Sequence, residues 1–155
     1  MVEGREPKLR LPPVEQVGIV VKDVDATMEF FSSVFGWGPW GVVELDMKGC
    51  LYRGESCDAR LKIAFAQSGS IEIELIQVLE GETIHTEFLR ERGEGLHHLR
   101  FKVDDLDAKL ADLAKEGIDV VFRKNLNGVE FAYLNTDRFG GIMLELIEYK
   151  AAQAE

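Results

Sequence analysis

Two polar residues with ligand chemistry, Gln16 and His98, stand just ahead of two similar stretches of the chain. The first stretch is VGIVVKDVDA at 17–26, and it reappears as LRFKVDDLDA at 99–108, an offset of 82 that also relates the two polar residues. An amide oxygen and an imidazole nitrogen both bind divalent cations in proteins. Because similar segments adopt similar structures, the repeat predicts that these two side chains occupy equivalent places.

A second repeated pair supplies two carboxylates. Glu74 stands within IELI and Glu145 within LELI, so each is flanked by Ile and Leu in a segment typical of a buried strand. An unpaired carboxylate in such a strand is costly unless a cation or a hydrogen-bond donor satisfies it. One nitrogen and three oxygen donors would leave two positions of an octahedral shell for substrate oxygens. The sequence therefore predicts a divalent-metal site of Gln16, Glu74, His98 and Glu145.

Ordinary structural roles compete with this hypothesis. His98 could be a hydrogen-bonded strand histidine, and the two carboxylates could form plain salt bridges with Arg100 or Lys62. Alternation along the strand places His98 and Arg100 on one face. By the same alternation His97 points the other way and is expected to be structural, whereas His85 is expected to be solvated.

Both halves of the chain show a strand, a helix and three further strands. Asp23 and Asp105 are predicted N-caps of two amphipathic helices, which end at Gly36 and Gly117. Alternating apolar residues predict the strands, in the first half at 14–21, 41–47, 60–67 and 71–78 and in the second half at 96–103, 118–123, 129–135 and 141–148. The fold class expected from this order is α+β.

The same pattern predicts the domain organisation. Residues 1–13 end in two prolines and are expected to form an extended N-terminal arm. A single domain follows at 14–149, made of two modules (14–78 and 96–149) and a connector (79–95) that holds a short helix.

Composition limits the classes of partner. The chain has 155 residues, a hydrophobic content of 46% and a net charge of −10, which suits one packed domain and argues against nucleic acid or an anionic membrane as a partner. No apolar run is long enough to span a bilayer, and the N-terminus lacks a signal-peptide core, so a cytoplasmic location is expected. Cys50 and Cys57 are accordingly expected to be free thiols, although a disulfide between them is conceivable.

Two stretches, GEGLHHLRFKVDDLDA at 93–108 and GIMLELIE at 141–148, together with the doubled order of elements, resemble the vicinal oxygen chelate superfamily. The resemblance covers residues 14–149. It implies two tandem βαβββ modules that form a curved, incomplete barrel, with a divalent ion (Zn, Co, Ni or Mn) in the cleft. The implied ligands come from the first and last strands of each module, which are the four positions named above. A homodimer is the common assembly of the superfamily and is the assembly expected here.

The ligand types distinguish members of the superfamily. The zinc-using glyoxalase I has Gln, Glu, His and Glu, which matches this chain, whereas the sequence around GEGLHH looks more like methylmalonyl-CoA epimerase. Gln16 replaces the first His of the extradiol dioxygenases and disfavours an iron dioxygenase. Bleomycin-binding proteins lack the ligands altogether.

The resemblance implies an isomerase, epimerase or lyase that removes a proton next to a carbonyl group of a small molecule, such as an acyl-thioester or a hydroxy or keto compound. Glu145 is the candidate base and Glu74 the acid or base on the opposite side. The second catalytic Glu of the epimerase aligns with Lys62, which makes Lys62 a third candidate catalytic residue and also a departure from that family. The alternative is a non-catalytic protein of resistance type that binds small molecules, and a metal-dependent dioxygenase is the third hypothesis.

Overall fold

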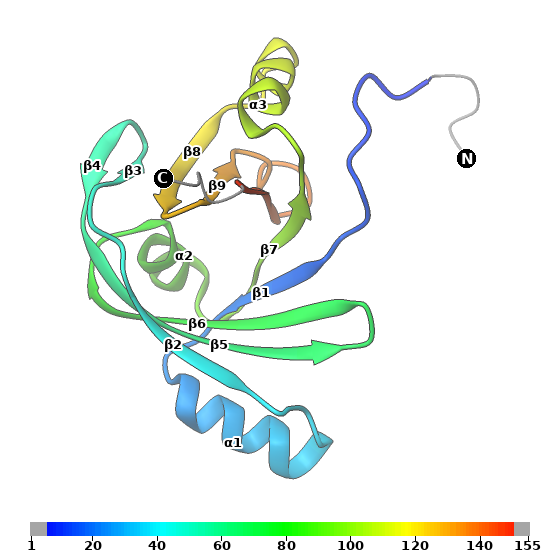
Figure 1. Cartoon of the computed structure of the whole chain (residues 1–155). Coiled ribbons are helices and arrows are strands. Elements are labelled where there is room, and N and C mark those ends of the chain that lie inside the picture. The colour runs from blue at the N-terminus through cyan, green and yellow to red at the C-terminus, as the bar shows by residue number, and fades with distance from the viewer. Residues whose placement is uncertain (1–5, 151–155) are drawn as a thin grey trace, which may run out of the picture.

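The computed structural model describes residues 6–150, which form one curved sheet of ten strands with three helices (Figure 1). The strands are β1 (Gln16–Val20), β2 (Gly41–Asp46), β3 (Cys50–Tyr52), β4 (Glu55–Cys57), β5 (Ala59–Ser68), β6 (Ile71–Gly81), β7 (Gly95–Lys102), β8 (Val120–Leu126), β9 (Val129–Leu134) and β10 (Met143–Tyr149). The helices are α1 (Val24–Phe35), α2 (Ile84–Arg92) and α3 (Leu106–Lys115). This is the expected α+β fold, with the sheet curled into an incomplete barrel.

The sheet order, β2-β5-β6-β1-β7-β10-β9-β8-β3-β4, places the two repeated strands β1 and β7 side by side in the middle. They run antiparallel, whereas β6 lies parallel to β1 and β10 lies parallel to β7. The registers also repeat, because Gly18 stands opposite Glu74 and its counterpart Arg100 stands opposite Glu145. The two copies of the sequence repeat are thus related by an approximate twofold axis at the β1–β7 pair.

The two long helices begin where the capping residues predict. The carboxylate of Asp23 accepts a hydrogen bond from the backbone N–H of Ala26, and Asp105 does the same for Ala108, so each satisfies a donor that the first helical turn leaves free. Gly36 ends α1 in a left-handed conformation, as expected, whereas the C-cap of α3 is Glu116, one residue before the predicted Gly117.

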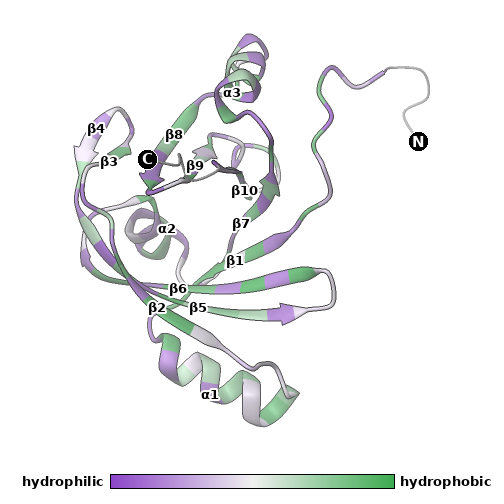
Figure 2. Cartoon of the chain, in the orientation of Figure 1, coloured by the Kyte–Doolittle hydropathy of each residue, from purple (hydrophilic) through white to green (hydrophobic). Residues whose placement is uncertain are grey.

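Apolar residues fill both faces of the sheet. Polar and apolar residues alternate along the first part of β6 (Figure 2), and successive side chains of a strand point to opposite faces of the sheet. On one face, Leu75 packs with Val24 of α1. On the other face, Ile76 belongs to the main core cluster, which also includes Ile84 of α2 and Phe131 of β9. The concave side of the sheet, where the site lies, is therefore bounded by apolar packing from both halves.

One hairpin was not predicted. The segment after β2 forms β3 and β4, and β3 pairs with β8 of the other half, which links the two ends of the curved sheet. The pairing sets Cys50 directly opposite Cys57, and the two form a disulfide, so the prediction of free thiols is wrong. The physical reason is the tight turn at Arg53-Gly54, which brings the cysteines into cross-strand register.

Residues 6–13, the described part of the predicted arm, contain no helix or strand and bend at Lys8 and Leu9; residues 1–5 lie outside the described residues. In the part of the chain that the structure covers, none of the helices is both long and apolar enough to cross a membrane.

Candidate metal centre

Three oxygen atoms from three strands converge on one buried nitrogen, Nε2 of His98. Oε1 of Gln16 lies 3.2 Å from it, Oε2 of Glu74 lies 3.3 Å from it, and Oε2 of Glu145 lies 3.0 Å from it. All four side chains are buried, and Gln16 and His98 have no exposed surface. The structure therefore brings together the four residues that the repeat predicted.

The register of the strands produces this convergence. His98 stands opposite Gly18 across the β1–β7 pair, and its ring lies over the place where a larger residue would carry a side chain. A Cβ atom at Gly18 would be only 1.9 Å from Cε1 of His98. Glycine at this position is thus required for the ring to reach the oxygens, which is a known reason for glycine within a strand.

Glu72 fixes the orientation of the Gln16 amide. The Nε2 group of Gln16 donates a hydrogen bond to Oε1 of Glu72 at 2.7 Å, which turns Oε1 of Gln16 toward His98. Glu72 also accepts a weaker bond from Arg100 at 3.4 Å, and Arg100 donates to Glu15 at 2.9 Å. These outer contacts hold the amide in the orientation that a metal ligand needs.

The charges around His98 favour a cation at this point. Burial by itself lowers the pKa of His98, but the negative charges of Glu145 and Glu74 outweigh burial and raise it to about 9. The single Nε2–H proton cannot satisfy three oxygen acceptors at once. Apart from its ion pair with His98 at 3.0 Å, Oε2 of Glu145 has no hydrogen-bond partner among residues 6–150.

The donor set fits a divalent ion in type and spacing. Donors that each lie about 2.1 Å from a metal are separated by about 3.0 Å along an octahedral edge and by about 3.4 Å in a tetrahedron. The three separations from His98 Nε2 span this range. Within residues 6–150 no group of three or more His, Cys, Asp or Glu side chains is arranged so that it could hold a metal ion as it stands, and the metal site therefore remains a proposal.

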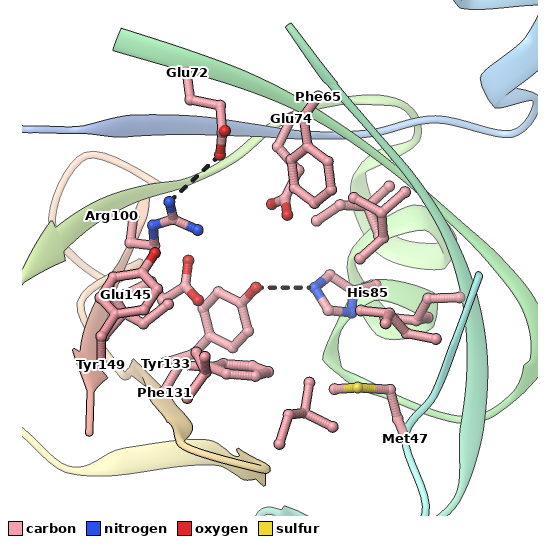
Figure 3. A pocket seen from close by; sticks show the side chains of 17 residues that line it. Met47, Phe65, Glu72, Glu74, His85, Arg100, Phe131, Tyr133, Glu145 and Tyr149 are labelled. Atoms are coloured by element: carbon pink, nitrogen blue, oxygen red, sulfur yellow. Dashed lines mark hydrogen bonds and ion pairs between the residues drawn. The ribbon is translucent and has the colours of Figure 1, made fainter. Parts of the chain in front are cut away.

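A cavity of about 370 Å³ adjoins the two carboxylates (Figure 3). Polar groups gather on its inner side, where Glu74, Glu145 and Arg100 point toward one another and the hydroxyl of Tyr133 faces His85. Another part of the wall is apolar and comes from β2, β5 and the loop after β2, with Leu45, Met47, Leu61 and Ile63, and Phe65 of β5 lies beside Glu74 (Figure 3). A small molecule with an apolar body and an oxygen-bearing end would match this division.

Lys62, the third catalytic candidate, is not part of this assembly. It alternates with the cavity-lining residues of β5 and therefore points to the other face of the sheet, where it pairs with Asp25 of α1. β5 itself supplies no acidic residue to the cavity, since its lining residues are Leu61, Ile63 and Phe65.

Two other interpretations change in the structure. His85 is not solvated but has an exposed fraction of only 2%, because it lies on the inward side of α2 against the aromatic residues of β8 and β9. The plain salt bridges proposed for the two carboxylates are not formed, because Arg100 pairs with Glu15 and Glu72. His97 is buried as a structural residue would be, but its Nδ1 lies 3.0 Å from Nδ1 of His98, so the two rings are in contact.

Sequence reasoning missed three contributors to the site. Glu72 could have been found, because it shares a strand face with Glu74 two residues away. Gly18 and Tyr133 gave no signal, since a lone glycine and an aromatic residue in a strand have many roles.

The comparisons with known proteins concern the family and the fold. A family model described as "Glyoxalase/Bleomycin resistance protein/Dioxygenase superfamily" matches residues 15–133. The chain is 26% identical over 143 residues to the uncharacterised protein YqjC of Bacillus subtilis (strain 168), covering 90% of this chain and 94% of that protein. It is 25% identical over 144 residues to mitochondrial methylmalonyl-CoA epimerase of Mus musculus, covering 90% of this chain and 75% of the relative.

Among solved structures, a methylmalonyl-CoA epimerase in complex with methylmalonyl-CoA and NH4+ superposes with a TM-score of 0.69 at 23% identity, over 94% of this chain and all (100%) of the other. That likeness concerns the fold.

Proposed function

The chain belongs to the glyoxalase, bleomycin resistance protein and dioxygenase superfamily, and from this premise we propose that it is a divalent-metal-dependent isomerase of the epimerase or glyoxalase type. Its reaction is the removal of a proton from a carbon next to a carbonyl group. The observation that carries the proposal is the set of three buried oxygens around His98 Nε2, at the edge of a cavity of about 370 Å³.

Gln16, Glu74, His98 and Glu145 are the residues that would hold the metal ion. When bound there, a divalent cation supplies Lewis-acid stabilisation of the negative charge that develops on the substrate oxygen. We propose that this cation is Zn, Co, Ni or Mn.

Glu145 is the base that we assign. The residue borders the cavity, and among residues 6–150 its buried Oε2 is held only by the ion pair with His98 Nε2 at 3.0 Å, so this carboxylate is placed to take a proton. Glu74 borders the same cavity from the other half of the sheet, and it can return a proton from a different direction. A pair of carboxylates on two sides of one carbon suits an epimerisation or an isomerisation.

The apolar wall restricts both the class of substrate and the residues that can act as acid or base. Because Lys62 faces α1 and the cavity side of β5 is apolar, a third acid is absent from that wall among the described residues. The wall instead suits the hydrocarbon part of an acyl compound and excludes water from the reacting carbon. The epimerases among the relatives act, by name, on methylmalonyl-CoA, and an acyl-thioester is therefore the first substrate class to test.

Solvent deuterium incorporation tests the proposal. The protein, loaded with each candidate metal, is incubated in D2O with methylmalonyl and other acyl-thioesters and with hemithioacetals, and exchange is followed by mass spectrometry. We expect exchange with at least one class, and loss of exchange on chelation and in Glu145→Gln. Glu44→Gln, which changes an exposed carboxylate on β2, is the matched control. Absence of exchange across the panel in fully metal-loaded protein contradicts the proposal.

The mostly apolar cavity also favours a second function, the sequestration of an aromatic or hydrophobic compound without chemistry. That function predicts tight binding that Glu145→Gln leaves unchanged, with no deuterium exchange in any ligand. The two outcomes separate the candidates in a single set of samples.

The cytoplasmic location, the homodimer and the division into modules 14–78 and 96–149 are proposals of the same kind. Light scattering on the purified full-length chain checks the dimer, with twice the mass of 17.4 kDa as the expected result.

A further inference from the structure

A second polar group, His85 with Tyr133, lines the cavity that the two carboxylates border. Both residues are buried, and Nε2 of His85 lies 3.3 Å from the hydroxyl of Tyr133. The Tyr133 ring stands between two imidazoles, with its centroid 5.5 Å from that of His85 and 5.0 Å from that of His98. Its hydroxyl points into the cavity (Figure 3).

The hydrogen bonds of Thr83 indicate which ring nitrogen of His85 carries the proton. The Thr83 hydroxyl is the N-cap of α2 and accepts the backbone N–H groups of His85 and of Thr86, so its own proton must be donated elsewhere. Nδ1 of His85, at 3.4 Å, can accept this proton, whereas Oγ1 of Thr86, at 3.5 Å, already accepts the backbone N–H of Thr83. Burial lowers the pKa of His85 to about 3, so its ring is neutral and carries one proton, which is then on Nε2.

This assignment gives the Tyr133 hydroxyl a defined role. The Nε2–H of His85 donates to the Tyr133 oxygen, which leaves the Tyr133 proton to be donated in turn. Among residues 6–150 the hydroxyl has a hydrogen bond with His85 and with no other residue. The chain of donors from Thr83 through His85 therefore ends in an O–H group directed at the cavity.

We propose that Tyr133 donates a hydrogen bond to the carbonyl oxygen of the bound ligand, and that His85 is the positioning residue that orients this hydroxyl. The ligand class is a carbonyl compound whose oxygen lies between Tyr133 and the two carboxylates. The proposal rests on the proposed function for the choice of carbonyl chemistry. It does not require turnover, since a hydrogen bond to the ligand is measurable as affinity.

The test compares two ligands that differ at one oxygen. Calorimetry measures the affinity of the full-length protein for an S-propionyl thioester of coenzyme A and for the matching S-propyl thioether, which lacks the carbonyl oxygen. The wild type is expected to prefer the thioester, and Tyr133→Phe is expected to reduce that preference by about 10-fold, the effect of one hydrogen bond of about 1.4 kcal/mol. Tyr149→Phe removes another hydroxyl that lines the same cavity and should keep the preference.

The His85 variants separate positioning from packing. Glutamine can present an N–H group where Nε2 of histidine does, so His85→Gln should retain most of the preference, and His85→Leu should lose it. Infrared spectroscopy of a carbon-13-labelled thioester carbonyl gives an independent signal, because a hydrogen bond lowers its stretching frequency in the wild type and its loss raises the frequency in His85→Leu.

The outcomes are decisive for each proposal. A wild type that binds thioester and thioether equally, or binds neither, overturns the role of Tyr133, and so does an unchanged preference in Tyr133→Phe. If Tyr133→Phe does not fold, the infrared shift in the wild type and in His85→Leu decides. A preference that depends on Tyr133 without any deuterium exchange leaves this inference standing and refutes the isomerase.

Discussion

Replacement of Gly18 by alanine tests the link between strand register and the metal site. The added Cβ would lie 1.9 Å from Cε1 and 2.4 Å from Nδ1 and Nε2 of His98. Since nonbonded carbon atoms prefer separations of about 3.5 Å, the ring must shift by about 1.5 Å or the strands must separate. His98 has no exposed surface, so it cannot relax toward solvent.

The size of the effect follows from this clash. Overpacking a buried site costs about 1–3 kcal/mol, and we expect the upper part of that range because the ring is held from several sides. A shift of about 1.5 Å also takes Nε2 out of reach of the oxygens that now lie 3.0–3.3 Å away. The affinity for a divalent metal should therefore fall by about 10-fold to 100-fold, the loss typical when the groups that orient a metal ligand are removed.

The assays are urea unfolding of the metal-free protein and calorimetric titration with the metal. Gly41→Ala is the matched control, because Gly41 also lies in a strand, needs no left-handed backbone, and would place its Cβ more than 4 Å from any neighbour. A Gly18→Ala protein as stable as Gly41→Ala, with unchanged metal affinity, would refute the reasoning that this glycine makes room for His98.

Three further predictions use other parts of the molecule. A divalent metal ion at about 100 times its Kd should raise the free energy of unfolding by about 2.7 kcal/mol, and a chelator should reverse this gain. At the same metal concentration Glu74→Gln should show a smaller gain in calorimetric melts. If the wild type gains no stability, the proposed set of metal ligands is wrong. His85 titrates at 6.5 when unfolded and at about 3 when folded, so the unfolded state binds the proton first and stability falls as pH drops below 6.5. Between about pH 7 and about pH 5.5 the wild type should lose about 1.3 kcal/mol more than His85→Leu in urea unfolding, and parallel pH profiles would contradict burial of a neutral ring. Asp23→Ala should cost about 1 kcal/mol through loss of the α1 cap, measured in the same way against Asp25→Ala, and an equal effect of both variants would argue against capping.

Local patterns in the sequence were sufficient for most of the fold. The caps Asp23 and Asp105 and the alternation of the long strands predicted where these elements begin, within a few residues. The two offsets also predicted that Gln16, Glu74, His98 and Glu145 converge, because a repeated segment carries its register with it. Periodicity and duplication are encoded locally, so they can be recognised without the tertiary structure.

The errors concern features that depend on distant parts of the chain. The hairpin of β3 and β4 consists of strands of three residues each, and its outer pairing is with β8, about 70 residues away, so alternation over three positions gave no signal. Burial of His85 depends on which side of a short helix faces the core. Lys62 was assigned to the site by alignment with the epimerase. Side chains alternate between the two faces of β5, and because the apolar neighbours of Lys62 face the core, this alternation would have placed Lys62 on the outer face.

The differences between the two copies of the repeat make the site chemically asymmetric. Gly18 and Arg100 occupy equivalent positions, each opposite a glutamate on its parallel neighbour. Glycine in the first copy admits the ring of His98, whereas arginine in the second copy places a partly buried guanidinium on which the charge of Glu145 acts. The duplicated backbone therefore brings two carboxylates to one cavity, and the side chains that differ between the copies give them different surroundings. Two carboxylates in unlike environments suit a site in which one takes a proton and the other returns it.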